Sequence, residues 1–275
     1  MTASIGSCFA AMSSAAAEAG ALVAKGFRQG AGARKKGAID LVTDFDMASQ
    51  ALIVQRLGEL CPGVALVAEE GRETRLGQEG EGDSLCFYVD PIDGTTNFAH
   101  GHPFFAVSIG LCQGRSPVAG VVFAPALGLT WTGVVGQGAW RNGEGCRVST
   151  CGGLSDALCA TGFGYDVVGS DDDNVREFRA IQNQVRGVRR CGAASLDLAL
   201  VADGTYDAYW EYLLQPWDLA GGAALVLAAG GRVSDFGLGP VDLMSGAILA
   251  SNGPVHEPLA KALVASRGGR PVPVH

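Results

Sequence analysis

The central segment of this chain reads Asp90-Pro91-Ile92-Asp93-Gly94-Thr95-Thr96-Asn97-Phe98 and carries two carboxylates three residues apart. It directly follows the apolar run 85–89, which predicts a buried strand. Because Pro91 fixes the backbone between the two acids, both side chains and the Ile92 carbonyl can point into one small volume. An all-oxygen pocket of this kind suits Mg²⁺ better than softer ligands would.

A phosphate cradle follows the second carboxylate. Gly94, Thr95 and Thr96 predict the start of a short helix, where free backbone N–H groups favour a bound phosphate. Metal ligands and a phosphate-binding turn therefore lie within a single nine-residue segment. The segment predicts a metal-dependent enzyme that acts on phosphoryl groups.

Four other segments match the motifs of a known family in the right order. They are Asp40-Leu41-Val42-Thr43-Asp44-Phe45-Asp46, Ala68-Glu69-Glu70-Gly71, Gly192-Ala193-Ala194-Ser195-Leu196-Asp197 and Trp217-Asp218-Leu219-Ala220-Gly221-Gly222. With these segments the chain resembles the inositol monophosphatases, within the lithium-sensitive, Mg²⁺-dependent sugar phosphatase superfamily. The resemblance runs from about Lys35 to about Asn252, which is nearly the whole chain.

Length, charge and cysteine content narrow the class of protein. The chain has 275 residues, a net charge of −8 and eight cysteines. The acidic balance argues against a nucleic-acid-binding surface as the main function. No two cysteines form a C-x-x-C pair, and the four histidines show no ligand spacing with them, so reduced packing thiols and a cytoplasmic location are expected.

The alanine-rich run 10–24 lacks the basic start of a signal peptide. It predicts an amphipathic first helix that ends near Lys25 and Gly26. No segment approaches the apolar length that a membrane span needs, so we expect no membrane association.

The first half, residues 1–150, predicts helices packed on an antiparallel sheet. A helix is expected at 44–60 with Thr43 as its N-cap, and a hairpin turn is expected at Asn142-Gly143. Strands are expected at 64–68, 85–89, 105–112, 118–123 and 129–135.

The second half, residues 151–275, alternates strands with helices, which predicts a mixed or parallel sheet covered by helices. Strands are expected at 158–163, 188–191 and 206–210, and helices at 173–186, 194–202 and 216–229. We expect a frayed tail at 266–275. The resemblance implies a layered sandwich of the sugar-phosphatase type, of α+β or α/β class, with the active site between the halves.

The resemblance also implies a set of metal ligands. A first Mg²⁺ would bind Glu69, Asp90 and the Ile92 carbonyl, and a second would bind Asp90, Asp93 and Asp218. A third, weaker ion would lie near Glu69. Each acid has a simpler reading, since aspartates commonly cap turns and helix starts, but the matching segments favour metal binding.

The resemblance assigns catalytic roles as well. The attacking water would be activated by the first metal, with Glu69 and Thr95 accepting or relaying its proton. Asp46 would hydrogen-bond Thr95 and orient its hydroxyl. The phosphate would rest on the backbone N–H groups of Gly94 and Thr95. A water on the second metal would protonate the leaving group, so no histidine is required.

The leaving group would contact the second half of the chain. Gly192 and Ala194 belong to the stretch that lies beneath the substrate in the family, and Asp218 borders it. Glu211 matches a carboxylate that accepts hydrogen bonds from inositol hydroxyls, and its charge disfavours a second phosphate. Many relatives carry a hydroxyl residue after the glycine, whereas this chain has Ala193 there.

Three positions remain open between two readings each. Glu70 could belong to the outer shell of the metals or face solvent. Arg189 and Arg190 could meet a second phosphate, or they could form an ion pair or a subunit contact.

The leading hypothesis is a cytoplasmic, homodimeric, lithium-sensitive hydrolase that releases phosphate from inositol 1-phosphate with Mg²⁺. The alternative within enzymes is a histidinol-phosphatase on the same fold, because fold does not settle substrate. From another class, some bacterial relatives act as regulators that bind the transcription machinery. The presence of all five residues of the central chemistry favours catalysis; they are Glu69, Asp90, Asp93, Thr95 and Asp218.

Overall fold

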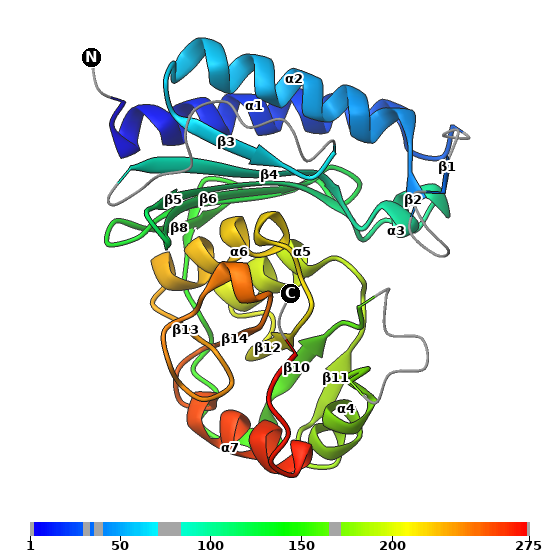
Figure 1. Cartoon of the computed structure of the whole chain (residues 1–275), viewed down its shortest axis with the longest axis vertical. Helices are drawn as coiled ribbons and strands as arrows, with labels where there is room; N and C mark the ends of the chain where they lie inside the picture. The colour runs from blue at the N-terminus through cyan, green and yellow to red at the C-terminus, as the bar shows by residue number, and fades with distance from the viewer. Residues whose placement is uncertain (1–2, 30–33, 36–40, 71–83, 165–171, 274–275) are drawn as a thin grey trace.

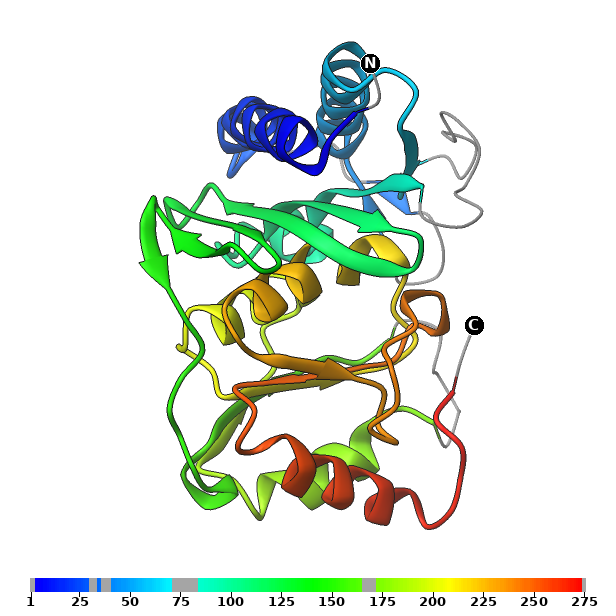
Figure 2. The same cartoon turned by 90° about the vertical axis from the view of Figure 1, so that its left-hand side faces the viewer.

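The chain folds into stacked layers of helices and sheets (Figures 1 and 2). The computed structural model describes residues 3–29, 34–35, 41–70, 84–164 and 172–273. Two long helices cover a seven-stranded sheet, two buried helices separate it from a five-stranded sheet, and two outer helices close the far side. This arrangement confirms the layered sandwich that the resemblance implied.

The seven-stranded sheet has the order β3-β4-β5-β6-β7-β8-β9. Its strands are β3 (Ala65–Ala68), β4 (Leu85–Asp93), β5 (Ala106–Gln113), β6 (Ser116–Ala124), β7 (Leu129–Val134), β8 (Gly138–Arg141) and β9 (Glu144–Cys146). All neighbours are antiparallel except β3 and β4, which run parallel. The parallel pair departs from the predicted all-antiparallel sheet. It brings the ends of β3 and β4 to the same edge.

The five-stranded sheet has the order β11-β10-β12-β14-β13 and is mixed, as predicted. Its strands are β10 (Leu158–Thr161), β11 (Gly187–Arg189), β12 (Ala208–Glu211), β13 (Arg232–Ser234) and β14 (Ile248–Ser251). β11, β10 and β12 run parallel, whereas β14 pairs antiparallel with both of its neighbours. The three parallel strands therefore end at one common edge.

Helices α1 (Ile5–Gly26) and α2 (Asp44–Leu60) form the outer layer over the larger sheet. The predicted Thr43 N-cap is confirmed, because its side chain accepts hydrogen bonds from the first turn of α2. By length and composition alone α1 could cross a membrane, which the sequence reading did not anticipate. In the structure one face of α1 is buried among the core residues of this layer, as in the core helix of a globular domain.

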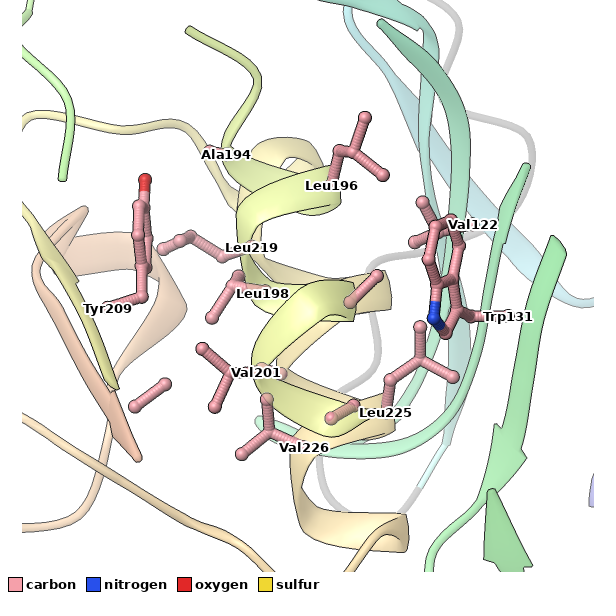
Figure 3. Packing of buried hydrophobic residues seen from close by; sticks show 14 of the residues in the cluster. Val122, Trp131, Ala194, Leu196, Leu198, Val201, Tyr209, Leu219, Leu225 and Val226 are labelled. Carbon is pink, nitrogen blue, oxygen red and sulfur yellow. The ribbon is translucent and has the colours of Figure 1, made fainter. Parts of the chain in front are cut away.

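Helices α5 (Ala194–Ala202) and α6 (Pro216–Ala228) lie between the two sheets and are apolar around most of their circumference. Figure 3 shows Trp131 and Val122 of the larger sheet on one side of these helices and Tyr209 of the smaller sheet on the other. The helices bury apolar surface against both sheets, which explains the nearly continuous hydrophobic runs in their sequences.

Glycines let α6 approach the larger sheet closely. A Cβ added at Gly120 of β6 would lie 2.1 Å from the carbonyl oxygen of Gly221, and one at Gly110 of β5 would lie 2.4 Å from the Ala220 methyl group. No side chain fits in those gaps, so the glycines are required by the backbone contact. The Trp-Asp-x-Ala-Gly-Gly pattern thus seats α6 against the sheet and fixes its N-terminus.

The remaining short elements are β1 (Arg34–Lys35), β2 (Leu41–Val42), α3 (Thr95–Ala99), and the 3₁₀ turns Leu154–Asp156 and Leu243–Ser245. Helix α4 (Val175–Gln182) is shorter than the predicted 173–186. It begins after Asn174 because Asn174 adopts a left-handed conformation and its side chain bonds Thr161 and Gly162.

Helix α7 (His256–Arg267) was not predicted, and the expectation of a frayed tail from residue 266 is wrong for the part that the structure describes. Arg267 is buried and bonds the Pro271 carbonyl, which anchors the tail.

Candidate active site

A β-bulge presents the two acids of the central segment. Strand β4 pairs with β5 up to Asp90 opposite Ser108, and pairing resumes at Asp93 opposite Ala106, so β4 contains one extra residue. Pro91, which has no N–H to donate to the ladder, lies in the irregular stretch. Bulges re-aim side chains next to functional sites, and here Asp90 and Asp93 are both buried at the end of the strand.

The parallel pairing of β3 and β4 brings a third acid to this edge. Ala68 lies opposite Val89, and the Glu69 N–H donates to the Val89 carbonyl at 3.2 Å. Glu69 therefore follows β3 where Asp90 follows Val89 on the neighbouring strand. Glu70 is buried rather than facing solvent, and Gln50 of α2 hydrogen-bonds both its N–H and its carbonyl.

The hydrogen bond expected between Asp46 and Thr95 is present. The Thr95 hydroxyl lies 3.0 Å from Asp46 Oδ1 and also 3.0 Å from the Ile92 carbonyl oxygen. The other oxygen of Asp46 accepts from the N–H and hydroxyl of Thr43, which caps α2. One carboxylate thus joins the start of α2 to the start of α3.

Asp93 connects the two halves of the molecule. Its Oδ2 accepts from the N–H and the hydroxyl of Ser195, at 2.7 and 2.5 Å, and its Oδ1 accepts from the Ala194 N–H at 3.2 Å. These donors belong to the first turn of α5, where unsatisfied N–H groups and the helix dipole favour a negative charge. The Ser195 hydroxyl is therefore hydrogen-bonded to a proposed metal ligand.

Asp218 lies in the first turn of α6, directly after Pro216-Trp217. Its Oδ2 accepts the Gln215 N–H at 2.7 Å, in a capping box with the residue that precedes the helix. The simpler reading of Asp218 as a helix-start carboxylate is thus present in the structure. It does not compete with metal binding, because Oδ1 is not used in this bond.

These carboxylates repel one another. Burial and the charges of Glu69, Asp93 and Asp218 raise the pKa of Asp90 well above its ordinary value. Burial and the charges of Asp93 and Glu69 raise the pKa of Asp218 in the same way. Like charges in a poorly solvated site are unfavourable unless a cation compensates them.

The donor set fits a hard divalent cation. Among the described residues, no Lys or Arg side chain forms an ion pair with Asp90, Asp93 or Asp218. All the donors are oxygens, which matches Mg²⁺. Within the same described residues, however, no three His, Cys, Asp or Glu side chains already converge as a metal-holding group. The carboxylates are instead oriented by hydrogen bonds to the protein.

A second group of polar residues lies where the parallel strands of the smaller sheet end. Glu211 ends β12 and accepts a hydrogen bond from the Tyr209 hydroxyl. Burial raises the pKa of Glu211 to about 7, although the bond from Tyr209 opposes that rise. A Cβ added at Gly162, just after β10, would lie 2.0 Å from Glu211 Oε2, so only glycine leaves room for this carboxylate.

Arg190 and Asp197 border Glu211. The exposed Arg190 guanidinium lies 5.7 Å from the centre of the Phe163 ring, and its charge lowers the pKa of Glu211. Asp197 of α5 is almost completely buried, and its Oδ1 has no hydrogen-bond partner among the described residues. Burial and the charge of Glu211 raise the pKa of Asp197 well above its ordinary value.

The conformation of Gly192 and hydrogen bonds from Asn97 hold the segment that contains Gly192 and Ala194. Gly192 has φ +85°, a conformation that favours glycine. The Asn97 amide donates to the carbonyls of Phe104 and Cys191, at 2.6 and 2.8 Å. Gly192 and Ala194 are thereby fixed against α3, and a Cβ at Gly94 would lie 3.2 Å from the Ala193 methyl group.

Sequence reasoning missed several contacts that shape the site. Tyr209 lies two residues before Glu211 on the same face of β12, so the two-residue period of a strand could have identified it. Asp197 and Asn97 stand inside motifs already quoted, but no sequence signal shows their partners. The side chain of Lys35, near which the family resemblance begins, lies outside the part of the chain that the structure describes.

Comparisons with known proteins cover nearly the whole chain. The sequence pattern described as "Inositol monophosphatase family" matches residues 7–267. The chain is 42% identical to "Inositol-1-monophosphatase" of Synechocystis sp., over 82% of this chain and 78% of that protein. It is 44% identical to "Nus factor SuhB" of Pseudomonas aeruginosa, over 79% and 80% of the two chains. The solved "Structure of Inositol monophosphatase from Anabaena (Nostoc) sp." superposes with TM-score 0.83 and 38% identity, covering 94% and 95%.

Proposed function

The chain belongs to the inositol monophosphatase family, and on this premise we propose that it releases phosphate from inositol 1-phosphate with the help of bound Mg²⁺. The observation that carries the proposal is the group of mutually repelling carboxylates, buried at Asp90 and Asp93 and half-buried at Glu69 and Asp218, at the ends of β3 and β4 and the start of α6. Members of the family are phosphatases that act on small phosphate monoesters, and the layout of this site suits that chemistry.

Two Mg²⁺ ions, with a third bound more weakly, are proposed as the cofactors. Glu69, Asp90 and the Ile92 carbonyl would hold one ion, and Asp90, Asp93 and Asp218 would hold the other. When bound, Mg²⁺ would supply an activated water and neutralise the charge of the phosphate. Its effect is needed because phosphate monoester hydrolysis requires up to roughly 10²¹-fold acceleration.

Thr95 and Glu69 are proposed to take the proton of the attacking water. The Thr95 hydroxyl can accept that proton at Oγ1 while passing its own to Asp46 Oδ1, which lies 3.0 Å away. Burial raises the pKa of Asp46 from its ordinary value, which favours proton acceptance there. The backbone N–H groups of Gly94 and Thr95 are proposed to bind the phosphate oxygens.

The leaving group is proposed to lie over Gly192 and Ala194, between Asp218 and Glu211. Glu211 would accept hydrogen bonds from inositol hydroxyls, and Tyr209 orients its carboxylate. A substrate with a second phosphate would meet Glu211, Asp197 and Asp93 in a poorly solvated region, so it should react more slowly.

The test is phosphate release from inositol 1-phosphate, histidinol phosphate and a bisphosphate, measured side by side with and without Mg²⁺. A Mg²⁺-dependent preference for inositol 1-phosphate supports the proposal. A preference for histidinol phosphate would keep the mechanism and change the leaving group, since the amine would find the paired acids Asp197 and Glu211. Faster turnover of the bisphosphate would contradict the role given to Glu211.

A second candidate function rests on the similarity to the protein named Nus factor SuhB. A regulatory role in binding the transcription machinery could accompany catalysis in this chain. A pull-down with wild type and Asp93→Asn separates the two, because partner capture by both proteins would show a role independent of the metal site. We further propose a cytoplasmic homodimer that is inhibited by lithium, to be tested by light scattering and by lithium titration of phosphate release.

A further inference from the structure

The two carboxylate oxygens of Asp93 accept hydrogen bonds of unequal length. Oδ2 accepts two short bonds from Ser195, one from the backbone N–H and one from the hydroxyl. Oδ1 accepts a longer bond from the Ala194 N–H, at 3.2 Å, and the Leu196 N–H also hydrogen-bonds the Asp93 carboxylate. Because each carboxylate oxygen offers about two acceptor sites, the two bonds from Ser195 are enough to fill Oδ2.

The hydrogen bonds between Asp93 and Ser195 join residues from both halves of the chain. Asp93 ends β4 of the larger sheet, whereas Ser195 lies in the first turn of α5, between the two sheets. Ser195 is completely buried and Asp93 is 7% exposed. Hydrogen bonds to an ionised group are short and roughly twice as strong as neutral ones. The carboxylate therefore cannot turn freely while α5 is in place.

We propose that Ser195 is a positioning residue that occupies Oδ2 of Asp93 and thereby turns Oδ1 toward the proposed metal site. The proposal rests on the proposed function, in which Asp93 is a metal ligand, and assigns to this chain's own serine the choice of the ligating oxygen. Residues that hydrogen-bond a ligand orient it and commonly affect metal affinity about 10–100-fold.

The chain offers a matched control for this serine. Ser108 of β5 is also completely buried, and its hydroxyl has no hydrogen-bond partner among the described residues. Ser195→Ala and Ser108→Ala remove the same atom from equally buried positions, but only the first removes a donor to Asp93. Ser195→Thr keeps the hydroxyl and serves as the rescue variant.

The first experiment is calorimetric titration of Mg²⁺ into the four purified proteins, with no substrate present. We expect Ser195→Ala to raise the Mg²⁺ dissociation constant by about 10-fold or more, Ser108→Ala to leave it unchanged, and Ser195→Thr to restore most of the affinity. Unchanged affinity in Ser195→Ala, or an equal loss in both alanine variants, would overturn the proposal.

A double-mutant cycle with Asp93→Asn shows whether the effect passes through that carboxylate. Thermal unfolding is measured in EDTA for the wild type, both single variants and the double variant. Coupled residues give non-additive effects, whereas independent residues add. A coupling between Asp93 and Ser195 supports the proposal, and additive effects would overturn it. Neither experiment requires turnover, so inactivity of the wild type on inositol 1-phosphate would contradict the proposed function alone.

Discussion

Two groups of buried charged residues differ in how their charge is balanced. At the outer helices, the buried Arg267 guanidinium of α7 pairs with Glu177 and, at 2.6 Å, with Asp172. It also lies 5.3 Å from the centre of the Tyr212 ring. Between the sheets, Asp90, Asp93 and Asp218 have no such partner within the described residues.

The difference distinguishes a structural cluster from a functional one. A buried ion pair that satisfies itself needs no ligand, and removing one member leaves the other uncompensated. A group of carboxylates with no cation beside it is unfavourable on its own, so such a group indicates a site that binds a cation. The Arg267 cluster should therefore govern stability, and the acidic cluster should govern metal binding and turnover.

The largest expected effect is loss of turnover in Asp93→Asn. The amide is a poorer ligand for a hard cation than the carboxylate is, so we expect the rate of phosphate release to fall about 100-fold or more. Circular dichroism should show an intact fold. Retention of more than about a tenth of the activity would remove Asp93 from the metal site.

Breaking the other cluster should produce the opposite pattern. Arg267→Met leaves Glu177 buried without its partner, so we expect the unfolding free energy to fall by about 3–5 kcal/mol. Denaturant titration measures this loss. At a temperature where the variant remains folded, its rate of phosphate release should equal that of wild type, and a matching loss of activity would show that the clusters are coupled.

Metal should stabilise only through the acidic cluster. Mg²⁺ at 100 times its dissociation constant should raise the unfolding free energy of the wild type by about 2.7 kcal/mol relative to EDTA, by mass action. Arg267→Met should gain a similar amount, and Asp93→Asn should gain much less. Equal stabilisation of all three proteins would place the binding site elsewhere.

Glu211 should give the smallest effect, and its sign follows from the raised pKa. The carboxyl has a pKa of about 7 when folded and 4.5 ordinarily, chiefly because of burial. The folded protein therefore holds the proton more tightly. This stabilisation is complete below pH 4.5 and is lost as the pH rises through about 7.

The measurement is the unfolding free energy in EDTA at a series of pH values, for wild type and Glu211→Gln. The unfolding free energy of the wild type should fall relative to that of Glu211→Gln as the pH rises from 4.5 through about 7. A difference that does not change with pH would mean that folding leaves the pKa of Glu211 at its ordinary value.

Local chemistry explains what could be predicted from the sequence. The cap at Thr43, the turn at Asn142-Gly143 and the bounds of α5 depend on residues close in the chain, and all three are confirmed. The ligand set of the central segment came from the family resemblance and stays a prediction.

Contacts between distant segments could not be predicted. Asp93 and Ser195 are 102 residues apart, and their bond exists only because α5 packs beneath β4. The tail was expected to fray from residue 266, but Arg267 forms an ion pair with the buried Glu177 of α4. Such pairings depend on how the layers stack, which no local pattern contains.

The capping of α2 has a consequence for how the enzyme responds to heat. Asp46 closes the first turn of that helix with one oxygen and holds the Thr95 hydroxyl with the other. If the first turn of α2 frays, the Asp46 carboxylate loses its fixed position, and the Thr95 hydroxyl is no longer oriented by it. Because helix ends open at lower free energies than whole domains do, activity should decline on warming before the global transition begins. The stability of the first turn of α2 would thus set the temperature above which the proposed proton relay fails.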